Sequence, residues 1–330
     1  MFRIALACLV AVLVAAPASA ACRGRNLINT LAAETQAGLR AAADAAPFAR
    51  GNLWRATRGD QVLHLIGTFH LDDPRHDALM ARLAPLIDGA STVLVEAGPE
   101  EEAALQAALA ADPSLVFLTN GPTLPETLAP ATWDRLKDAL RARSIPPFLG
   151  AKMRPAYLSM LLSLPPCALN GATEPQNGLD RRIIARTRAQ GIPLRALEPF
   201  SVVFDIFSDM TLADQVALLD LSLALDAQSE DVFATLTDAY FAEDSRMIWE
   251  FSRWQALTLP GLDAAQVADD FALMEDRMMS DRNRAWIPVI EAALADGPAL
   301  AAFGALHLSG PDGVLALLQQ AGFAVERLKL

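Results

Sequence analysis

Short apolar runs bounded by glycine, proline and polar residues recur along this chain and predict the strands of a sheet. A short apolar run that ends in glycine is typical of a buried strand that leaves its sheet. A turn at residues 58–60 joins the first two as a hairpin. The predicted strands lie at residues 51–57, 61–67, 91–96, 192–197 and 299–304.

Segments with helical periodicity separate the predicted strands. A helix at residues 75–87 connects the strand at 61–67 to the strand at 91–96. This order implies a right-handed crossover and parallel pairing of the two strands. The other predicted helices lie at residues 26–46, 132–143, 155–164, 180–190 and 264–295, the last of them bent at Pro288.

The order of strands and helices predicts the fold class. We expect an α/β fold with a mixed, mainly parallel sheet that draws its strands from both ends of the chain. Residues 122–170 and 201–260 carry mostly helical patterns. We interpret them as a helical insertion that forms a lid or wall. Residues 21–330 are expected to form a single domain.

The tetrapeptide pattern Gly-x-x-His ends two of the predicted strands. The copies are Gly67-Thr68-Phe69-His70 and Gly304-Ala305-Leu306-His307, and each continues with Leu, a proline at the same offset and a helical pattern. Polar side chains just past strand ends are where open α/β sheets build their sites. We interpret the copies as two related strand–loop–helix halves that bring two imidazoles to one place.

Glu96 ends the strand at 91–96, so its carboxylate is expected at the same edge of the sheet as His70. Two imidazoles and a carboxylate are common ligands of a catalytic divalent metal ion, because they suit Zn, Mn, Co and Fe and leave positions open for water. We therefore predict a shared site in which His70, Glu96 and His307 lie within about 8 Å of one another and bind one ion. Mn, Co and Zn are the candidate metals.

The remaining histidines and several carboxylates are interpreted as structural. His64 lies inside a strand, and His76 opens a helix and is expected to be exposed. The run Glu100–Glu102 is typical of a helix N-terminus, where acidic side chains suit the helix dipole. Asp180 can cap the helix that it begins, and Glu198 can act likewise at its strand end.

The first residues have the pattern of a secretory signal peptide. Arg3 is followed by an apolar stretch at residues 4–16 and by the small residues 17–20. We expect the signal peptide to span residues 1–20 and the mature chain to be periplasmic or secreted. A lipoprotein is the alternative, because Cys22 lies just past the cleavage region, although the usual leucine three positions upstream is missing. No later stretch reaches the roughly 18 apolar residues of a membrane-spanning helix.

Removal of a signal peptide would leave Cys22 and Cys167 as the only cysteines. An even pair in an exported chain favours a disulfide, and two separate buried thiols are the alternative.

The net charge of −12 and the absence of a basic run argue against nucleic acid or an anionic membrane as a partner, because both attract clustered Lys and Arg. The hydrophobic content of 53% is ample for a core. Composition therefore leaves a peptide or a small molecule as the expected partner, and the oligomeric state stays open.

Motifs spread over the chain occur in an order known from one family. They are Leu53-Trp54, Gly67-Thr68-Phe69-His70, Glu96, Lys152-Met153-Arg154-Pro155, Gly178-Leu179-Asp180, Leu197-Glu198, Arg282-Asn283 and Gly304-Ala305-Leu306-His307-Leu308. With these, residues 53–330 resemble the TraB/PrgY/GumN family, which includes the Tiki metalloproteases. The paired Gly-x-x-His motifs with an intervening Glu are the most specific part. The chain departs from many relatives after Lys152, where they have Pro-Trp.

The resemblance implies a metal-dependent hydrolase of the wider Tiki and erythromycin-esterase-like group, with His70, Glu96 and His307 at its centre. It implies that Arg282 and Asn283 lie close by. A guanidinium and an amide in such a place can bind a substrate carboxylate or a developing oxyanion. The alternative for Arg282 is an ion pair on a helix surface. Lys152 and Asp180 are further candidates for substrate binding.

Three classes of function follow from these residues. The first is an exported metallohydrolase of peptide or amide-like bonds, in which Glu96 or a histidine that is not a ligand acts as base. The second is a periplasmic binding protein that holds a metal, haem or small effector in the same cleft. The third is an interaction protein in export or surface signalling with a vestigial site. Metal content separates the third class from the others, and turnover separates the first from the second.

Overall fold

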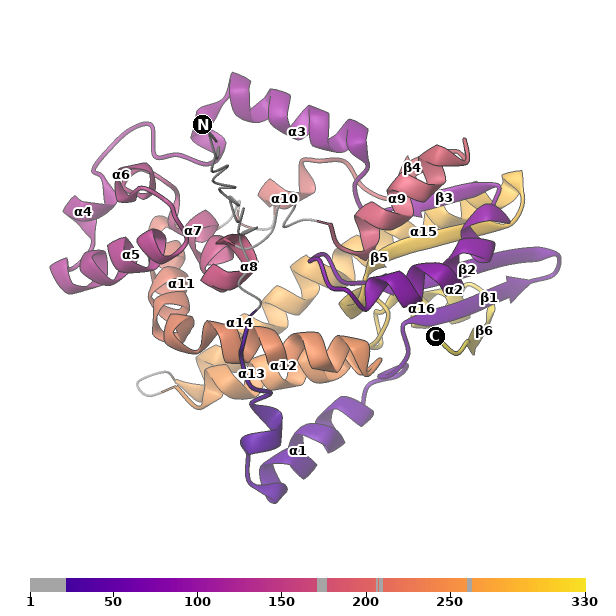
Figure 1. Ribbon diagram of the computed structural model, residues 1–330, viewed down its shortest axis with the longest axis horizontal. Helices are drawn as coiled ribbons and strands as arrows, with labels where there is room; N and C mark the ends of the chain where they lie inside the picture. The colour runs from indigo at the N-terminus through magenta and orange to yellow at the C-terminus, as the bar shows by residue number, and fades with distance from the viewer. Residues whose placement is uncertain (1–21, 171–176, 206, 208–209, 260–262) are drawn as a thin grey trace, which may run out of the picture.

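A computed structural model describes residues 22–170, 177–205, 207, 210–259 and 263–330 of the chain. The predicted signal peptide lies outside the described residues. The fold is mixed α/β, with an open six-stranded sheet and helices around it (Figure 1). Its strands are β1 (Leu53–Arg58), β2 (Gln61–Thr68), β3 (Thr92–Val95), β4 (Leu194–Ala196), β5 (Ala299–Gly304) and β6 (Ala324–Arg327).

The sheet has the order β4-β3-β5-β2-β1-β6. The strands β4, β3, β5 and β2 pair in parallel, whereas β1 pairs antiparallel with both β2 and β6. The expectation of a mainly parallel sheet from both ends of the chain is confirmed. Direct pairing of β2 with β3 is wrong, because β5 lies between them and pairs with each. Local sequence order could not show this, since β5 comes from the far end of the chain.

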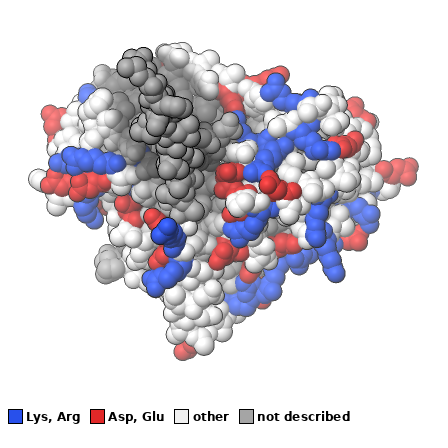
Figure 2. Space-filling model, in the orientation of Figure 1, with Lys and Arg blue, Asp and Glu red and all other residues white. Residues whose placement is uncertain are grey.

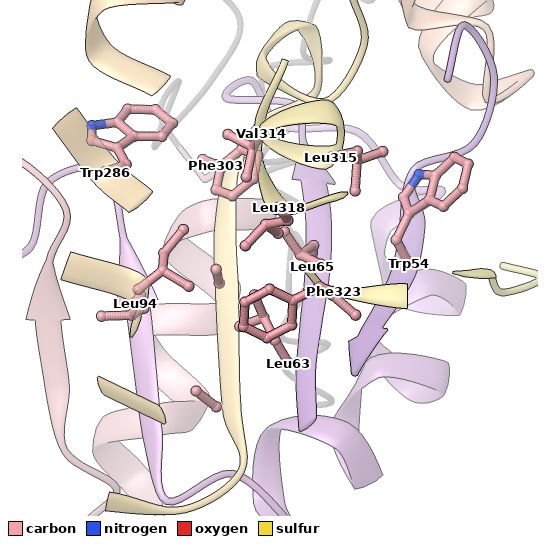
Figure 3. Close-up of a cluster of buried hydrophobic side chains, with 14 of the residues drawn as sticks. Trp54, Leu63, Leu65, Leu94, Trp286, Phe303, Val314, Leu315, Leu318 and Phe323 are labelled. Atoms are coloured by element: carbon pink, nitrogen blue, oxygen red, sulfur yellow. The ribbon is translucent and has the colours of Figure 1, made fainter. Parts of the chain in front are cut away.

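Helices cover both faces of the sheet. One face packs against α2 (His76–Asp88) and α9 (Leu179–Ala189), and the other against α15 (Asp281–Ala293) and α16 (Val314–Gln320). Successive side chains of a strand point to opposite faces. In β5, Leu300 and Ala302 accordingly belong to the first core and Phe303 to the second. Figure 3 shows the second core, where Trp286 and Phe303 lie near the carboxyl end of β5.

A separate helical part lies beside the sheet (Figure 1). Its own core joins α4 (Leu124–Thr127), α5 (Pro130–Ala142), α7 (Pro155–Leu162) and α11 (Leu212–Leu225). Leu136, Leu158 and Leu219 of this core are fully buried. These segments agree with the predicted helical insertion. Its helices, with the neighbouring α1 and α3, are α1 (Ala33–Asp44), α3 (Pro99–Ala111), α4 (Leu124–Thr127), α5 (Pro130–Ala142), α6 (Pro147–Gly150), α7 (Pro155–Leu162), α8 (Pro166–Asn170), α10 (Val202–Asp205), α11 (Leu212–Leu225), α12 (Ser229–Phe241) and α13 (Ser245–Leu257).

Two predicted helices are interrupted. The segment predicted at 26–46 is a 3₁₀ turn followed by α1, because Leu31 and Ala32 adopt extended backbone between them. The long helix predicted at 264–295 is divided into α14 (Ala264–Glu275) and α15 by a π-helical turn, η4 (Asp276–Ser280). Such turns often occur beside functional sites. This one directly precedes Arg282.

A disulfide joins Cys22 to Cys167 of α8, which are separated by 145 positions in the sequence. The predicted bond is thus present. It ties the start of the described chain to the helical part. A cross-link over so long a loop restricts the unfolded chain strongly.

Among the described residues, no helix is long and apolar enough to cross a membrane. Basic and acidic side chains lie next to one another on the face seen in Figure 2. Ion pairs also join α9 to the segment around α2, such as Arg182 with Asp72 and Arg186 with Asp88. Charges on this face therefore largely compensate one another locally.

Candidate functional site

The two Gly-x-x-His loops pack directly against each other at the carboxyl ends of β2 and β5. The strands are neighbours, with Gly67 opposite Phe303. A β-carbon on Gly67 would lie 2.6 Å from Cδ1 of Leu308 and 2.9 Å from Cα of Ala305. Only glycine allows so close an approach, since the β-carbon of any other residue would lie closer to these atoms than van der Waals contact permits. The first motif glycine therefore makes room for the second motif.

The second motif glycine leaves a small space that three candidate side chains surround. A β-carbon on Gly304 would lie 3.2 Å from Oε1 of Glu96, 3.3 Å from Nε2 of His70 and 3.7 Å from Cδ2 of His307. Glu96 follows β3, so three neighbouring strands deliver the three groups to one edge of the sheet. The structure thus brings together His70, Glu96 and His307, as the sequence predicts. We call this space the Gly304 cradle.

His70 is oriented by Asp180, the second residue of α9. Its Nδ1 lies 2.9 Å from Oδ2 of Asp180, and the other carboxylate oxygen accepts a hydrogen bond from Thr68. Gly178 lets α9 approach, because a β-carbon there would lie 2.2 Å from the carbonyl group of His70. Leu179 N–H donates to the carbonyl oxygen of Phe69 at 2.9 Å. The Gly178-Leu179-Asp180 motif is therefore the support of the first imidazole.

The Asp180 carboxylate raises the pKa of His70 to about 9. The imidazole is 63% exposed, so solvent screens part of this attraction. The direction follows from the geometry, because a carboxylate 2.9 Å from a ring nitrogen favours the protonated ring.

His307 lies in a different environment from His70, because it is buried on the 3₁₀ turn η6 (Ala305–His307). Its ring centroid lies 4.4 Å from that of Trp286. Its Nδ1 lies 2.6 Å from Oδ1 of Asn283, and its Nε2 lies 3.3 Å from Nη1 of Arg282. Burial lowers the pKa of His307 to about 3, so this imidazole is neutral at physiological pH. The two motif histidines are thus electrostatically unlike.

Glu96 is held ionised. Its Oε1 accepts the backbone N–H of Gly304 at 2.6 Å and lies 3.7 Å from Nε2 of His307. Burial opposes the charged form, but the cations His70 and Arg282 together with the N–H of Gly304 keep the pKa of Glu96 below its usual range.

Arg282 joins two carboxylates that end neighbouring strands. Its guanidinium donates to Glu198 at 2.9 and 2.6 Å and to Oε2 of Glu96 at 3.2 Å. Trp286 Nε1 also donates to Glu198 at 2.9 Å. The Arg282 side chain is only 14% exposed, so the alternative of a surface helix pair is wrong. The local sequence pattern did not predict that Glu198 bonds to Arg282 and Trp286, although Leu197-Glu198 is one of the family motifs.

Asn283 and Asp180, two of the candidates for substrate binding, are bonded to the motif histidines, and the third candidate, Lys152, is exposed. Asn283 is buried, and its amide is bonded to His307 and to the carbonyl oxygen of Asp312. Asp180 is bonded to His70 and Thr68 rather than capping α9, whose cap position is Gly178. Lys152 is exposed before α7 and interacts electrostatically with Glu126 of α4.

Of the two remaining histidines, His64 has the environment predicted from the sequence and His76 does not. His64 lies in β2 opposite Arg55, as expected of a strand residue. His76 opens α2, but it is fully buried rather than exposed. Its Nε2 lies 3.0 Å from the carbonyl oxygen of Leu71, and its ring packs near Phe241, with 5.3 Å between the centroids. The helical part covers this start of α2, which a local pattern could not show.

A family model supports the identification of these motifs. The model of the TraB/PrgY/gumN family matches residues 52–327. The chain belongs to this family. No curated protein and no solved structure matches it. The match contains every residue of the Gly304 cradle and both helices that support it, so the site described above lies inside the TraB/PrgY/gumN region.

The donor groups of this TraB/PrgY/gumN protein fit a divalent metal ion by their chemistry. Two imidazoles and a carboxylate face the Gly304 cradle, and both histidines have Nδ1 bonded to a side-chain oxygen, as metal-binding histidines usually do. Within the described part of the chain, no group of three or more His, Cys, Asp or Glu side chains is arranged to hold a metal as it stands. The Arg282 guanidinium instead contacts two of the three metal-donor groups, Nε2 of His307 and Oε2 of Glu96.

Proposed function

We propose that this protein is an exported, metal-dependent hydrolase that cleaves peptide or amide-like bonds. The observation that supports the proposal is the convergence of His70, Glu96 and His307 on the Gly304 cradle. This donor set suits Mn, Co or Zn. The Cys22–Cys167 disulfide supports export, because such bonds persist mainly in oxidising compartments.

In the proposed site, His70, Glu96 and His307 would hold the ion. The chemistry that a divalent ion supplies there is polarisation of the substrate carbonyl and a lower pKa of the attacking water. Because His70 is exposed, substrate can reach the proposed site from solvent on that side. If Glu96 or one of the histidines is instead not a ligand, that residue would accept the proton of the water. Arg282 offers a guanidinium beside the cradle that can stabilise a developing oxyanion.

Metal removal tests the proposal. We expect the purified mature protein to contain a divalent metal ion and to hydrolyse members of a peptide library. Exhaustive treatment with EDTA should abolish hydrolysis, and re-addition of Mn, Co or Zn should restore it. Metal analysis and peptide turnover are the measurements.

Three results would contradict or redirect the proposal. Hydrolysis that survives complete chelation would show that the metal is not needed. A protein that binds metal, haem or a small effector without any turnover would instead be a binding protein. A wild-type protein that retains no metal in any of these conditions would leave the interaction protein as the remaining class.

The His70–Asp180 pair predicts a pH dependence of stability in the metal-free protein. The pKa of His70 in the folded state is raised to about 9, above the value near 6.5 of a free imidazole. The pair therefore stabilises the fold fully below about pH 6.5, and its contribution is lost as pH rises through about 9. Because His70 is 63% exposed, we expect less than about 1 kcal/mol.

Urea unfolding in EDTA at pH 6 and pH 10 measures this contribution. The Asp180→Asn variant keeps an acceptor for Thr68 but loses the charge, so it should show a smaller drop in stability between the two pH values than the wild type. Equal drops in the two proteins would show that Asp180 does not stabilise protonated His70.

A further inference from the structure

We propose that Asn283 is a positioning residue that fixes the tautomer of His307, with hydrogen on Nδ1 and the lone pair on Nε2. The inference deepens the proposed function. It rests on that function in one respect, because metal binding is the use that the proposed function gives to the Nε2 lone pair. It replaces the expectation that Asn283 touches substrate. Three sets of contacts around the buried His307 ring support it.

The first set fixes the orientation of the Asn283 amide. Its Nδ2 donates to the carbonyl oxygen of Asp312 at 2.9 Å and lies 3.5 Å from the carbonyl oxygen of His307. Both of these partners are acceptors only, so they must face the nitrogen of the amide. Oδ1 is therefore the atom 2.6 Å from Nδ1 of His307, and Nδ1 must carry the hydrogen that is donated to it.

The second set is a contact at the other ring nitrogen, Nε2, and it does not involve Asn283. Arg282 Nη1 lies 3.3 Å from Nε2 of His307. A guanidinium has donors and no acceptor, so Nε2 must offer a lone pair to make this contact. Arg282 and Asn283 are adjacent in α15, and they approach opposite nitrogens of the same imidazole. Both contacts require the same tautomer.

The third set prevents the ring from turning over. The His307 side chain is only 7% exposed, and its ring packs against Trp286 and Phe303, with centroids 4.4 and 6.2 Å away. A ring flip would point a carbon at Oδ1 of Asn283 and leave a buried amide oxygen without its donor. The lone pair of Nε2 is thus directed to the side of the ring that faces Glu96.

The tautomer can be measured without any activity. The full mature chain, labelled with ¹⁵N-histidine and treated with EDTA at pH 8, should show His307 with a protonated Nδ1 and an unprotonated Nε2 in its ¹⁵N shifts. Asn283→Leu keeps the volume but removes the acceptor, so this pattern should be lost or mixed. Binding of Co²⁺ alone should weaken about 10–100-fold, as is usual when a partner of a metal-bound histidine is removed.

Asn52→Leu is the matched control. Asn52 is also buried, and its amide donates to the carbonyl oxygen of Tyr240 at 2.9 Å and accepts from Ser245, so within the described residues its side chain is hydrogen-bonded to no histidine. This variant should lose stability without changing the His307 shifts or, once folded, the Co²⁺ affinity. A structural role alone would make the two variants alike.

The outcomes separate this inference from the proposed function. A wild-type protein with hydrogen on Nε2 of His307 would overturn the inference even if Co²⁺ binds. An unchanged tautomer in Asn283→Leu would also overturn it, because another group would then fix the ring. If the wild type binds no metal, the proposed metallohydrolase fails, while the shifts of wild type and Asn283→Leu still decide whether Asn283 fixes the tautomer.

Discussion

Replacing His70 with alanine should lower peptide hydrolysis by at least about 100-fold, because the proposed site loses a ligand and the most exposed of its three candidate side chains. The unfolding midpoint should change little, since the side chain is exposed and Asp180 keeps its bond from Thr68. Turnover, metal content and thermal unfolding are the measurements. His64→Ala, at the half-buried position opposite Arg55, is the control and should retain activity.

His307→Ala should lose activity and also stability. A loop position just past a strand predicts few core contacts for both motif histidines, but only His70 has this character. Loss of the buried His307 ring would leave a cavity beside Trp286 and an unpaired Asn283 amide. We expect a cost of about 2–3 kcal/mol in the free energy of unfolding. Equal stability of the two alanine variants would contradict the different burial of the two rings.

Arg282→Ala should destabilise the protein by about 3 kcal/mol, because it leaves Glu96 and Glu198 largely buried without their shared counter-ion. Urea unfolding at pH 7 measures the loss. Arg282→Lys restores the charge but not the two-pronged contact with Glu198, so it should lie between alanine and wild type.

Arg284→Ala provides the matched control two residues further along α15. That guanidinium is 48% exposed and pairs with Asp281 and Asp312, so its removal should destabilise the protein far less than Arg282→Ala. If Arg282→Ala is no more destabilising than Arg284→Ala, the pairing of Arg282 with the two strand-end carboxylates is not a major source of stability. Metal binding by Arg282→Ala would show in addition that the guanidinium is not needed to hold the ion.

The strands and the meeting of the two motifs could be predicted because both depend on local patterns. An apolar run ending in Gly-x-x-His specifies a strand and a polar loop, and parallel strands place such loops at one edge. The partners of the histidines could not be predicted in the same way. Asp180 and Asn283 lie on helices far away in sequence, and nothing in their local pattern distinguishes a cap or a substrate contact from a bond to an imidazole.

The burial of His76 and the interruption before Arg282 escaped prediction for related reasons. The amphipathic pattern of α2 leaves its first residue at the polar end, and residues distant in sequence, such as Tyr240 and Phe241 of α12, help to cover it. The segment Asp276–Ser280 has no proline or glycine, so its residues alone gave no reason to expect a break in the helix.

The central place of β5 has a consequence for how the chain acquires its structure. Strands β2 and β3 each pair with β5 and not with each other, so a growing chain has only the separate pairs β1–β2 and β3–β4 until residues 299–304 are available. Contacts between such distant segments form slowly. The sheet, and with it the site, can therefore assemble only after nearly the whole polypeptide has been synthesised, and the apolar edges of β2 and β3 stay open to aggregation or to chaperones until then.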